Sequence, residues 1–252
     1  MIRINDVDVF DTPEELLNPQ HAAVLVIDMQ NETGSEEGGY AKHGHDMSRM
    51  RSIIPAIQRV LEASRRLNLP IVFTEFVHRD RRGVTLVDGP GVYLHRHEKW
   101  ISDVTDGSWA ARTLDELAPQ RGELIIQKSR ASALNGTYLD DLLRAREVRT
   151  VLLMGCLTDG CVLKTAVDLT EHGYYPAVVK DAVNSLTAEK HELGLKYIEM
   201  KFPTFSSDEV MAVWAGFPHR EKRAAAADDP LEAINVRILE RAAEHEQTSA
   251  AH

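Results

Sequence analysis

Three residues that could act together in nucleophilic chemistry lie far apart in the sequence: Asp28, Lys128 and Cys161. Asp28 ends the apolar run "AAVLVID", Lys128 ends "GELIIQK", and Cys161 follows the end of "RTVLLMGC" by five residues. A thiolate is a strong nucleophile, a nearby ammonium group favours its formation, and a carboxylate can accept the thiol proton. Together the three residue types predict attack on an electrophilic carbon, provided that the fold brings them together.

The apolar runs that carry these residues alternate with segments of helical periodicity. We expect strands over residues 22–28, 69–76, 122–128, 149–156 and 175–183. We expect helices over residues 47–68, 137–147, 159–173 and 187–202, and residues 204–214 should close the core. This alternation predicts an α/β fold with a mainly parallel sheet covered by helices on both faces. The carboxyl ends of parallel strands meet at one edge of the sheet, so Asp28, Glu75, Lys128 and Cys161 should converge there.

Cys161 lies at the start of a predicted helix, just after Asp159. A helix N-terminus lowers the pKa of a nearby thiol, and its free N–H groups can bind a developing oxyanion. Taken singly, the three residues have plainer interpretations: a packing cysteine, a turn-forming aspartate and a surface lysine. Their combination at three strand ends favours the catalytic interpretation.

Composition limits the class of protein. The formal net charge of −10 argues against nucleic acid or an anionic membrane as the main partner. Two cysteines cannot build a disulfide framework, and the acidic N-terminus lacks signal-peptide features, so we expect a cytoplasmic protein. The length suits an N-terminal arm (1–20), one main domain (21–217) and a charged helical extension (218–252). The extension could pack on a neighbouring subunit or on its own core.

Three segments resemble the signatures of the isochorismatase-like cysteine hydrolases: "VIDMQN", "IIQKSRASALNGTYLDDLLRAR" and "LMGCLTDGCVLKTAVDL". The resemblance implies a three-layer α-β-α, Rossmann-like fold and a catalytic triad of Asp28, Lys128 and Cys161. It also implies a cis peptide bond between Cys156 and Leu157, and an oxyanion hole formed by the amides of Leu157 and Cys161. Cys156 then has a packing role.

Within this family the sequence favours the amidase branch. Isochorismatases proper lack the cysteine, and the Asp-x-His metal motif of nicotinamidases is missing from "TEFVHRDRRGV". Five histidines could be imagined as a metal cluster: His43, His45, His78, His95 and His97. They have no matching carboxylates, so we expect no metal and no cofactor.

The remaining candidates are hydrolases of small linear amides and ureido or carbamoyl compounds, releasing ammonia. The segment "NETGSEEGGYAKHGHDMS" resembles a loop of ureidoacrylate and biuret hydrolases. Leu134 and Asn135 replace aromatic residues of the lysine motif of these enzymes, and Thr33 replaces a frequent pocket Phe, which makes the transfer of a named substrate unsafe. Alternatives are a nicotinamidase-like or maleamate-type amidase, or a non-catalytic redox sensor that uses Cys161 with Cys156 near by.

Candidate substrate contacts are Asn31, Arg130 and Lys201. Arg130 would suit a substrate carboxylate, or it is a surface or interface charge. We expect Glu75 to support other groups rather than to be a fourth catalytic residue. Residues 78–110 have the length of a lid or a subunit contact, and four side chains could cover the pocket: Tyr40, His78, Trp100 and Trp109. By analogy with the family we expect a homodimer or homotetramer acting on a small molecule.

Overall fold

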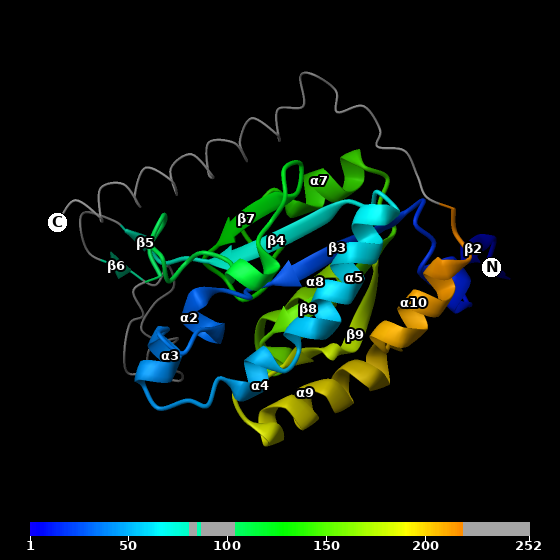
Figure 1. Ribbon diagram of the computed structural model, residues 1–252. Helices are drawn as coiled ribbons and strands as arrows, with labels where there is room; N and C mark the ends of the chain where they lie inside the picture. The colour runs from blue at the N-terminus through cyan, green and yellow to red at the C-terminus, as the bar shows by residue number, and fades with distance from the viewer. Residues whose placement is uncertain (81–84, 87–103, 219–252) are drawn as a thin grey trace.

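The computed structural model describes residues 1–80, 85–86 and 104–218, and this part of the chain forms a parallel sheet of six strands (Figure 1). The sheet order is β10-β9-β8-β3-β4-β7, and each neighbouring pair is parallel. The strands are β3 (Ala22–Ile27), β4 (Ile71–Phe76), β7 (Leu124–Lys128), β8 (Thr150–Cys156), β9 (Tyr175–Asn184) and β10 (Thr204–Phe205). The predicted parallel α/β sheet is confirmed.

The strand order reverses between β3 and β8, because the chain runs outward from β3 through β4 to β7 and then returns to β8. At this point Ile27 lies level with Thr74 on one side and with Gly155 on the other. Asp28 therefore follows β3 at the place where parallel sheets usually bind ligands. A Cβ atom on Gly155 would lie 2.1 Å from the Ile27 carbonyl oxygen, so only glycine permits β3 and β8 to approach this closely.

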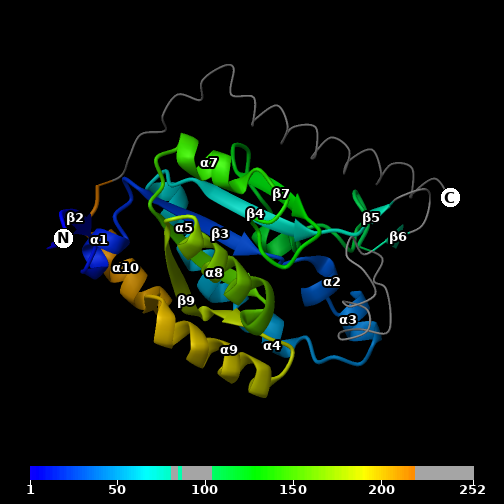
Figure 2. The same ribbon diagram turned by 180° about the vertical axis from the view of Figure 1, so that it is seen from behind.

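Helices cover both faces of the sheet, which gives the predicted three layers (Figure 1) (Figure 2). Helices α5 (Ile54–Arg66) and α10 (Ser207–Ala215) bury Ile57, Val60 and Trp214 in the cluster on one face. The other face holds α7 (Leu139–Ala145), α8 (Leu163–Glu171) and α9 (Ala188–Lys201). Because both faces of the sheet are covered by helices, the ends of the strands, where Asp28 and Lys128 lie, are the part of the sheet left for a site.

One predicted helix is divided in the structure, and the N-terminal arm has secondary structure of its own. The helix expected over residues 47–68 is divided into α4 (Ser48–Arg51) and α5, because Pro55 lies in the first turn of α5, where it is tolerated. The N-terminal arm contains an antiparallel hairpin, β1 (Ile2–Ile4) and β2 (Val7–Val9), followed by the short helix α1 (Pro13–Leu16).

The shorter elements near the site are α2 (Asn31–Gly34), α3 (Gly39–Lys42), η1 (Asp115–Leu117), and the paired strands β5 (Arg79–Asp80) and β6 (Thr85–Leu86). Residues 219–252 of the predicted extension lie outside the described part of the chain. In the described ranges, no helix combines the length and the apolar character that crossing a membrane requires.

Candidate functional site

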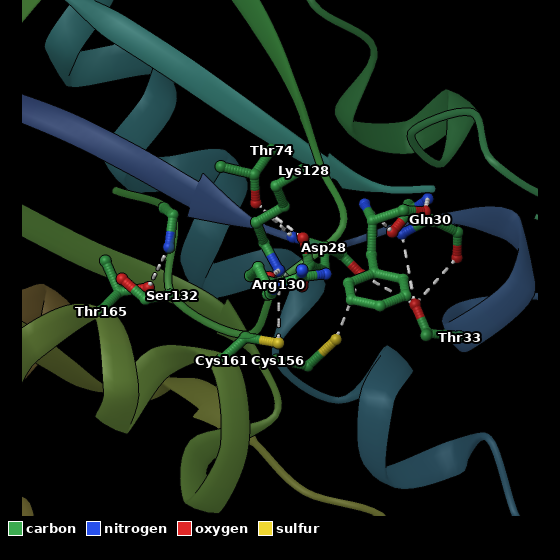
Figure 3. A network of polar contacts seen from close by, with 12 residues as sticks. Asp28, Gln30, Thr33, Thr74, Lys128, Arg130, Ser132, Cys156, Cys161 and Thr165 are labelled. Carbon is green, nitrogen blue, oxygen red and sulfur yellow. Dashed lines mark hydrogen bonds and ion pairs between the residues drawn. The ribbon is translucent and has the colours of Figure 1, made fainter. Parts of the chain in front are cut away.

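The structure brings Asp28, Lys128 and Cys161 into one contact group at the carboxyl edge of the sheet (Figure 3). The Lys128 ammonium lies 2.7 Å from Asp28 Oδ2 and 3.3 Å from Cys161 Sγ. The three residues come from the ends of β3 and β7 and from the turn after β8. The arrangement has the parts that thiol activation needs: an acceptor for the proton and a cation beside the sulfur.

Asp28 is held on several sides by hydroxyl groups and backbone. Its backbone has a positive φ of 51°, a conformation that non-glycine residues adopt rarely. The Thr74 hydroxyl donates to Asp28 Oδ1 at 2.7 Å, and the Thr33 hydroxyl donates to the Asp28 carbonyl oxygen at 2.8 Å. The carboxylate is therefore fixed with one oxygen on Thr74 and the other on Lys128. Sequence reasoning missed Thr74; its position beside Glu75 at a strand end was the available signal.

Lys128 is fully buried, and three acceptors surround its ammonium group. Besides Asp28 and Cys161, Nζ donates to the Arg130 carbonyl oxygen at 3.0 Å, and the Phe76 ring centroid lies 4.9 Å away. Burial lowers the pKa of Lys128, but its interactions with Asp28 and Cys161 outweigh burial and raise the pKa above its ordinary value. The lysine is therefore a permanent cation in the site.

Cys161 lies in a distorted turn between β8 and α8. The peptide bond between Cys156 and Leu157 is cis, as the resemblance implies, and the π-helical turn η2 (Thr158–Val162) follows. The Leu157 carbonyl accepts hydrogen bonds from the amides of Gly160 (2.9 Å) and Val162 (3.1 Å). Within the described residues no acceptor takes the Leu157 N–H, so this donor is available to a ligand.

The expected lowering of the Cys161 pKa is wrong. Burial raises the pKa of the Cys161 thiol to about 12; the Lys128 charge lowers this pKa and the Asp28 charge, a smaller effect, raises it, so that burial dominates. The thiol therefore carries its proton at neutral pH. The interaction of this thiol with the Asp28 carboxylate is among the causes of the rise, so an acceptor for the proton lies near the sulfur. The site favours proton transfer during attack over a preformed thiolate.

Cys156 has a different environment from Cys161. It is buried in the core, and its Sγ donates to the Asp28 carbonyl oxygen at 3.2 Å. Burial raises the pKa of the Cys156 thiol far above its ordinary range. A sulfur without solvent access and with a firmly held proton suits the packing role predicted for it.

The predicted substrate contacts are placed unevenly. Arg130 lies beside the contact group (Figure 3), and its side chain donates to the Ser129 carbonyl at 3.2 Å. Asn31 is buried near by, and its Nδ2 donates to the Trp109 carbonyl at 2.9 Å, which uses one of its two amide hydrogens. Substrate binding by these two residues stays a prediction.

Lys201 does not join the site. It ends α9, and the next residues place Thr204 level with Val178, early in β9, whereas the site lies beyond Asn184. The helix returns along the whole sheet, about 21 Å for its 14 residues. Lys201 therefore lies toward the amino-terminal edge of the sheet, opposite the edge that carries Asp28 and Cys161, and it is not a substrate contact of this site.

Glu75 supports a neighbouring segment, as expected for it. Its Oε1 accepts hydrogen bonds from the Thr113 amide (3.0 Å) and hydroxyl (3.2 Å). The buried side chain of Gln30 bridges the same segment to β4, donating to the Ala111 (2.7 Å) and Phe76 (3.0 Å) carbonyls. Burial raises the pKa of Glu75 to about 7. Gln30 and Thr113, which sequence reasoning did not single out, hold residues 111–113 against the site.

The side chains proposed to cover the pocket are described only in part. Tyr40 stacks in a tilted arrangement on His45, with centroids 5.5 Å apart, and the buried His78 pairs with Thr105 beside the site. Trp109 is 41% exposed. Trp100, His95 and His97 lie outside the described residues. The part of the chain that is described has no group of three metal-ligating side chains, and the expectation of no metal stays a prediction.

Comparison with known proteins relates this chain to one family and to amide-hydrolysing relatives. Residues 22–209 match the Isochorismatase domain family. The chain is 30% identical over 200 residues to a ureidoacrylate amidohydrolase of Agrobacterium fabrum, covering 74% of this chain and 83% of that protein. It is 29% identical over 208 residues to an N-carbamoylsarcosine amidase of an Arthrobacter species, covering 79% and 73% of the two chains.

A solved isochorismatase-like hydrolase from Alkaliphilus metalliredigens superposes with a TM-score of 0.64 at 26% identity, covering 79% of this chain and 99% of the other. The fold, the residues matched by the family and the relatives all point to the same family. This chain therefore belongs to the isochorismatase domain family.

Proposed function

We propose that this protein hydrolyses the terminal C–N bond of a small ureido, carbamoyl or linear amide compound, with Cys161 as nucleophile and release of ammonia. Hydrolysis of C–N bonds in linear amides is the activity of the curated relatives, and this chain is an enzyme of that class. The contact of one ammonium group with both Asp28 and Cys161 carries the proposal for the site.

In the first half of the reaction, Asp28 takes the Cys161 proton as the sulfur attacks the amide carbon. The negative charge moves to the carbonyl oxygen, where the amides of Leu157 and Cys161 donate to it and the Lys128 charge stabilises it. Asp28 then gives its proton to the departing nitrogen, and ammonia leaves. The product on the enzyme is a thioester of Cys161 for a linear amide, and the corresponding thiocarbamate for a ureido or carbamoyl compound.

In the second half, water replaces ammonia. Asp28 removes a proton from the water as it attacks the thioester or thiocarbamate, and the same oxyanion donors are used again. The thiol takes back its proton when the carbon–sulfur bond breaks, which releases a carboxylic or carbamic acid. A base that accepts and returns one proton twice needs a fixed position, which the contacts of Asp28 with Thr74 and Lys128 supply.

The two cysteines offer a matched test. Ammonia release is measured with biuret, triuret, ureidoacrylate, N-carbamoylsarcosine, maleamate and nicotinamide, for the wild type, Cys161→Ala and Cys156→Ala. We expect Cys161→Ala to lower kcat by at least about 10³-fold and Cys156→Ala to keep near-normal turnover. The opposite pattern, or turnover of none of these compounds, would contradict the proposal.

The same ammonia-release assay, extended to Asp28→Asn and to a chelator, separates the alternatives. A redox sensor would use the two thiols without needing Asp28, whereas hydrolysis needs the carboxylate and not Cys156. Nicotinamide turnover that disappears with a chelator would instead support a metal-containing nicotinamidase. Activity on the ureido compounds in the presence of the chelator supports the proposed class.

A further inference from the structure

We propose that His191 and Gly194 of α9 are positioning residues, which hold the turn Leu157–Cys161 so that its amides and thiol face the substrate. Here that stretch is called the nucleophile turn. The inference rests on the proposed function for what the turn does, and on contacts with Thr158 and Asp159 for how α9 holds it.

Gly194 lets the helix touch the backbone of the nucleophile turn. It is buried in the interior of α9, and a Cβ atom there would lie 2.8 Å from the Asp159 nitrogen and 2.9 Å from the Asp159 Cα. Real Cβ atoms essentially never approach backbone this closely, so a side chain would push α9 and the turn apart. Glycine is unfavourable in a helix interior, and this close approach accounts for it here.

His191 makes a second contact, one turn earlier on the same helix. Its Nδ1 lies 2.9 Å from the hydroxyl of Thr158, which is completely buried. Burial lowers the pKa of His191, which favours the neutral ring that can accept a hydrogen bond. Thr158 directly follows Leu157, so this bond acts next to one of the proposed oxyanion donors.

The end of β9 holds the turn from a third point. The Ser185 hydroxyl donates to Asp159 Oδ1 at 2.6 Å, and the Asp159 amide donates back to Ser185 Oγ at 3.3 Å. These contacts reach Thr158 and Asp159, and they affect the thiol only through the position of the backbone. The geometry therefore makes α9 a support for the nucleophile turn. Gly194 sets the distance between α9 and the turn, and His191 fixes the position of Thr158 along the helix.

Gly194→Ala is the direct test, with Gly216→Ala as its control. At Gly216 a new Cβ would find its nearest atom at 3.5 Å, an ordinary contact. We expect Gly194→Ala to lower kcat about tenfold or more, with KM within about twofold, because displacement of the reacting groups impairs chemistry more than binding. The control should keep the wild-type kcat. Wild-type kcat in Gly194→Ala would overturn the proposal.

Alkylation of Cys161 by iodoacetamide gives a readout that needs no substrate. It is followed by intact mass in a Cys156→Ala background, so that a single sulfur reacts. We expect slower alkylation in Gly194→Ala than in Gly216→Ala, since the displaced sulfur loses its contact with Lys128. If the wild type hydrolyses no amide, the proposed function fails, and the alkylation rates still decide the positioning role: equal rates overturn it.

His191 provides a test that remains if Gly194→Ala does not fold. His191→Leu removes the partner of Thr158, whereas the side-chain oxygen of His191→Asn can replace Nδ1. We expect His191→Leu to lower kcat about three- to tenfold and His191→Asn to restore it to within about twofold. Equal impairment of the two variants, or a loss of thermal stability without any change in kcat, would contradict a positioning role.

Discussion

Two buried acids end adjacent parallel strands of this protein, and their partners differ completely. Asp28, after β3, contacts the Lys128 ammonium and the Thr74 hydroxyl. Glu75, in β4, accepts from the amide and hydroxyl of Thr113, both uncharged donors. The same edge of the sheet thus supplies one acid next to a cation and a thiol, and another that fastens residues 111–113.

The comparison shows that position at the carboxyl edge does not by itself make a catalytic acid. A carboxylate can exchange protons with a nucleophile only if that nucleophile lies next to it, and only Asp28 has Cys161 as a neighbour. Without a compensating cation, burial raises the pKa of Glu75 to about 7, so the side chain is close to half-protonated in neutral solution. The two acids should therefore respond to mutation in different ways.

The largest difference should come from neutralising each acid in turn. We expect Asp28→Asn to lower kcat by about 10³- to 10⁴-fold, because an amide cannot accept the thiol proton. Glu75→Gln should stay within about threefold of the wild type, since Thr113 keeps an acceptor. Ammonia release measured on the same substrate compares them. Equal losses in both variants would erase the distinction between the two acids.

Removing the cation should convert the Asp28 site into one that resembles the Glu75 site. Lys128→Met leaves Asp28 buried without its counter-ion, and we expect it to cost about 3–5 kcal/mol of unfolding free energy in addition to a loss of activity. Urea denaturation and ammonia release measure the two effects. A Lys128→Met protein as stable and active as the wild type would show that the ion pair is dispensable.

Glu75 should make stability depend on pH. A raised pKa means that the folded state binds the proton more tightly than the unfolded state, so the contribution is complete below about pH 4.5 and is lost as pH rises through about 7. The shift from 4.5 to about 7 corresponds to about 3 kcal/mol as an upper value. In urea titrations at pH 5 and pH 8, Glu75→Gln should lose less stability with rising pH than the wild type.

The smallest effects should come from the two threonine hydroxyls that serve the acids. Thr74→Val removes the donor to Asp28 Oδ1, and Thr113→Val removes one of two donors to Glu75. We expect each to cost about 1–2 kcal/mol of stability, but only Thr74→Val to lower kcat, by about tenfold. A greater loss of activity in Thr113→Val than in Thr74→Val would reverse the assignment of the two acids.

Much of this arrangement followed from the sequence. Apolar runs separated by helical segments specify parallel strands, and parallel strands bring their ends together, so the convergence of Asp28, Lys128 and Cys161 was predictable from spacing and residue type. The cis bond at Cys156 came from the resemblance. Lys201 was misplaced because a helix that follows one strand must run back to the start of the next.

Other features depend on contacts that a single sequence does not specify. Thr113 meets Glu75 across 38 residues, through a segment without a periodic pattern. The raised pKa of the Cys161 thiol depends on how deeply the turn is buried, which residue type alone does not determine. Gly194 was interpreted only as part of a helix, because the backbone it approaches belongs to an element about 35 positions earlier.

Gly155 sets the distance between β3 and β8, and through it the position of Asp28 relative to Cys161. A side chain there would meet the Ile27 backbone and force β3 away from β8, and with it the Asp28 carboxylate away from the Cys161 sulfur. Engineers who reshape the pocket for a new substrate could vary its lining widely while leaving this one site unchanged. A randomised library should accept many residues beside the site and almost none at 155.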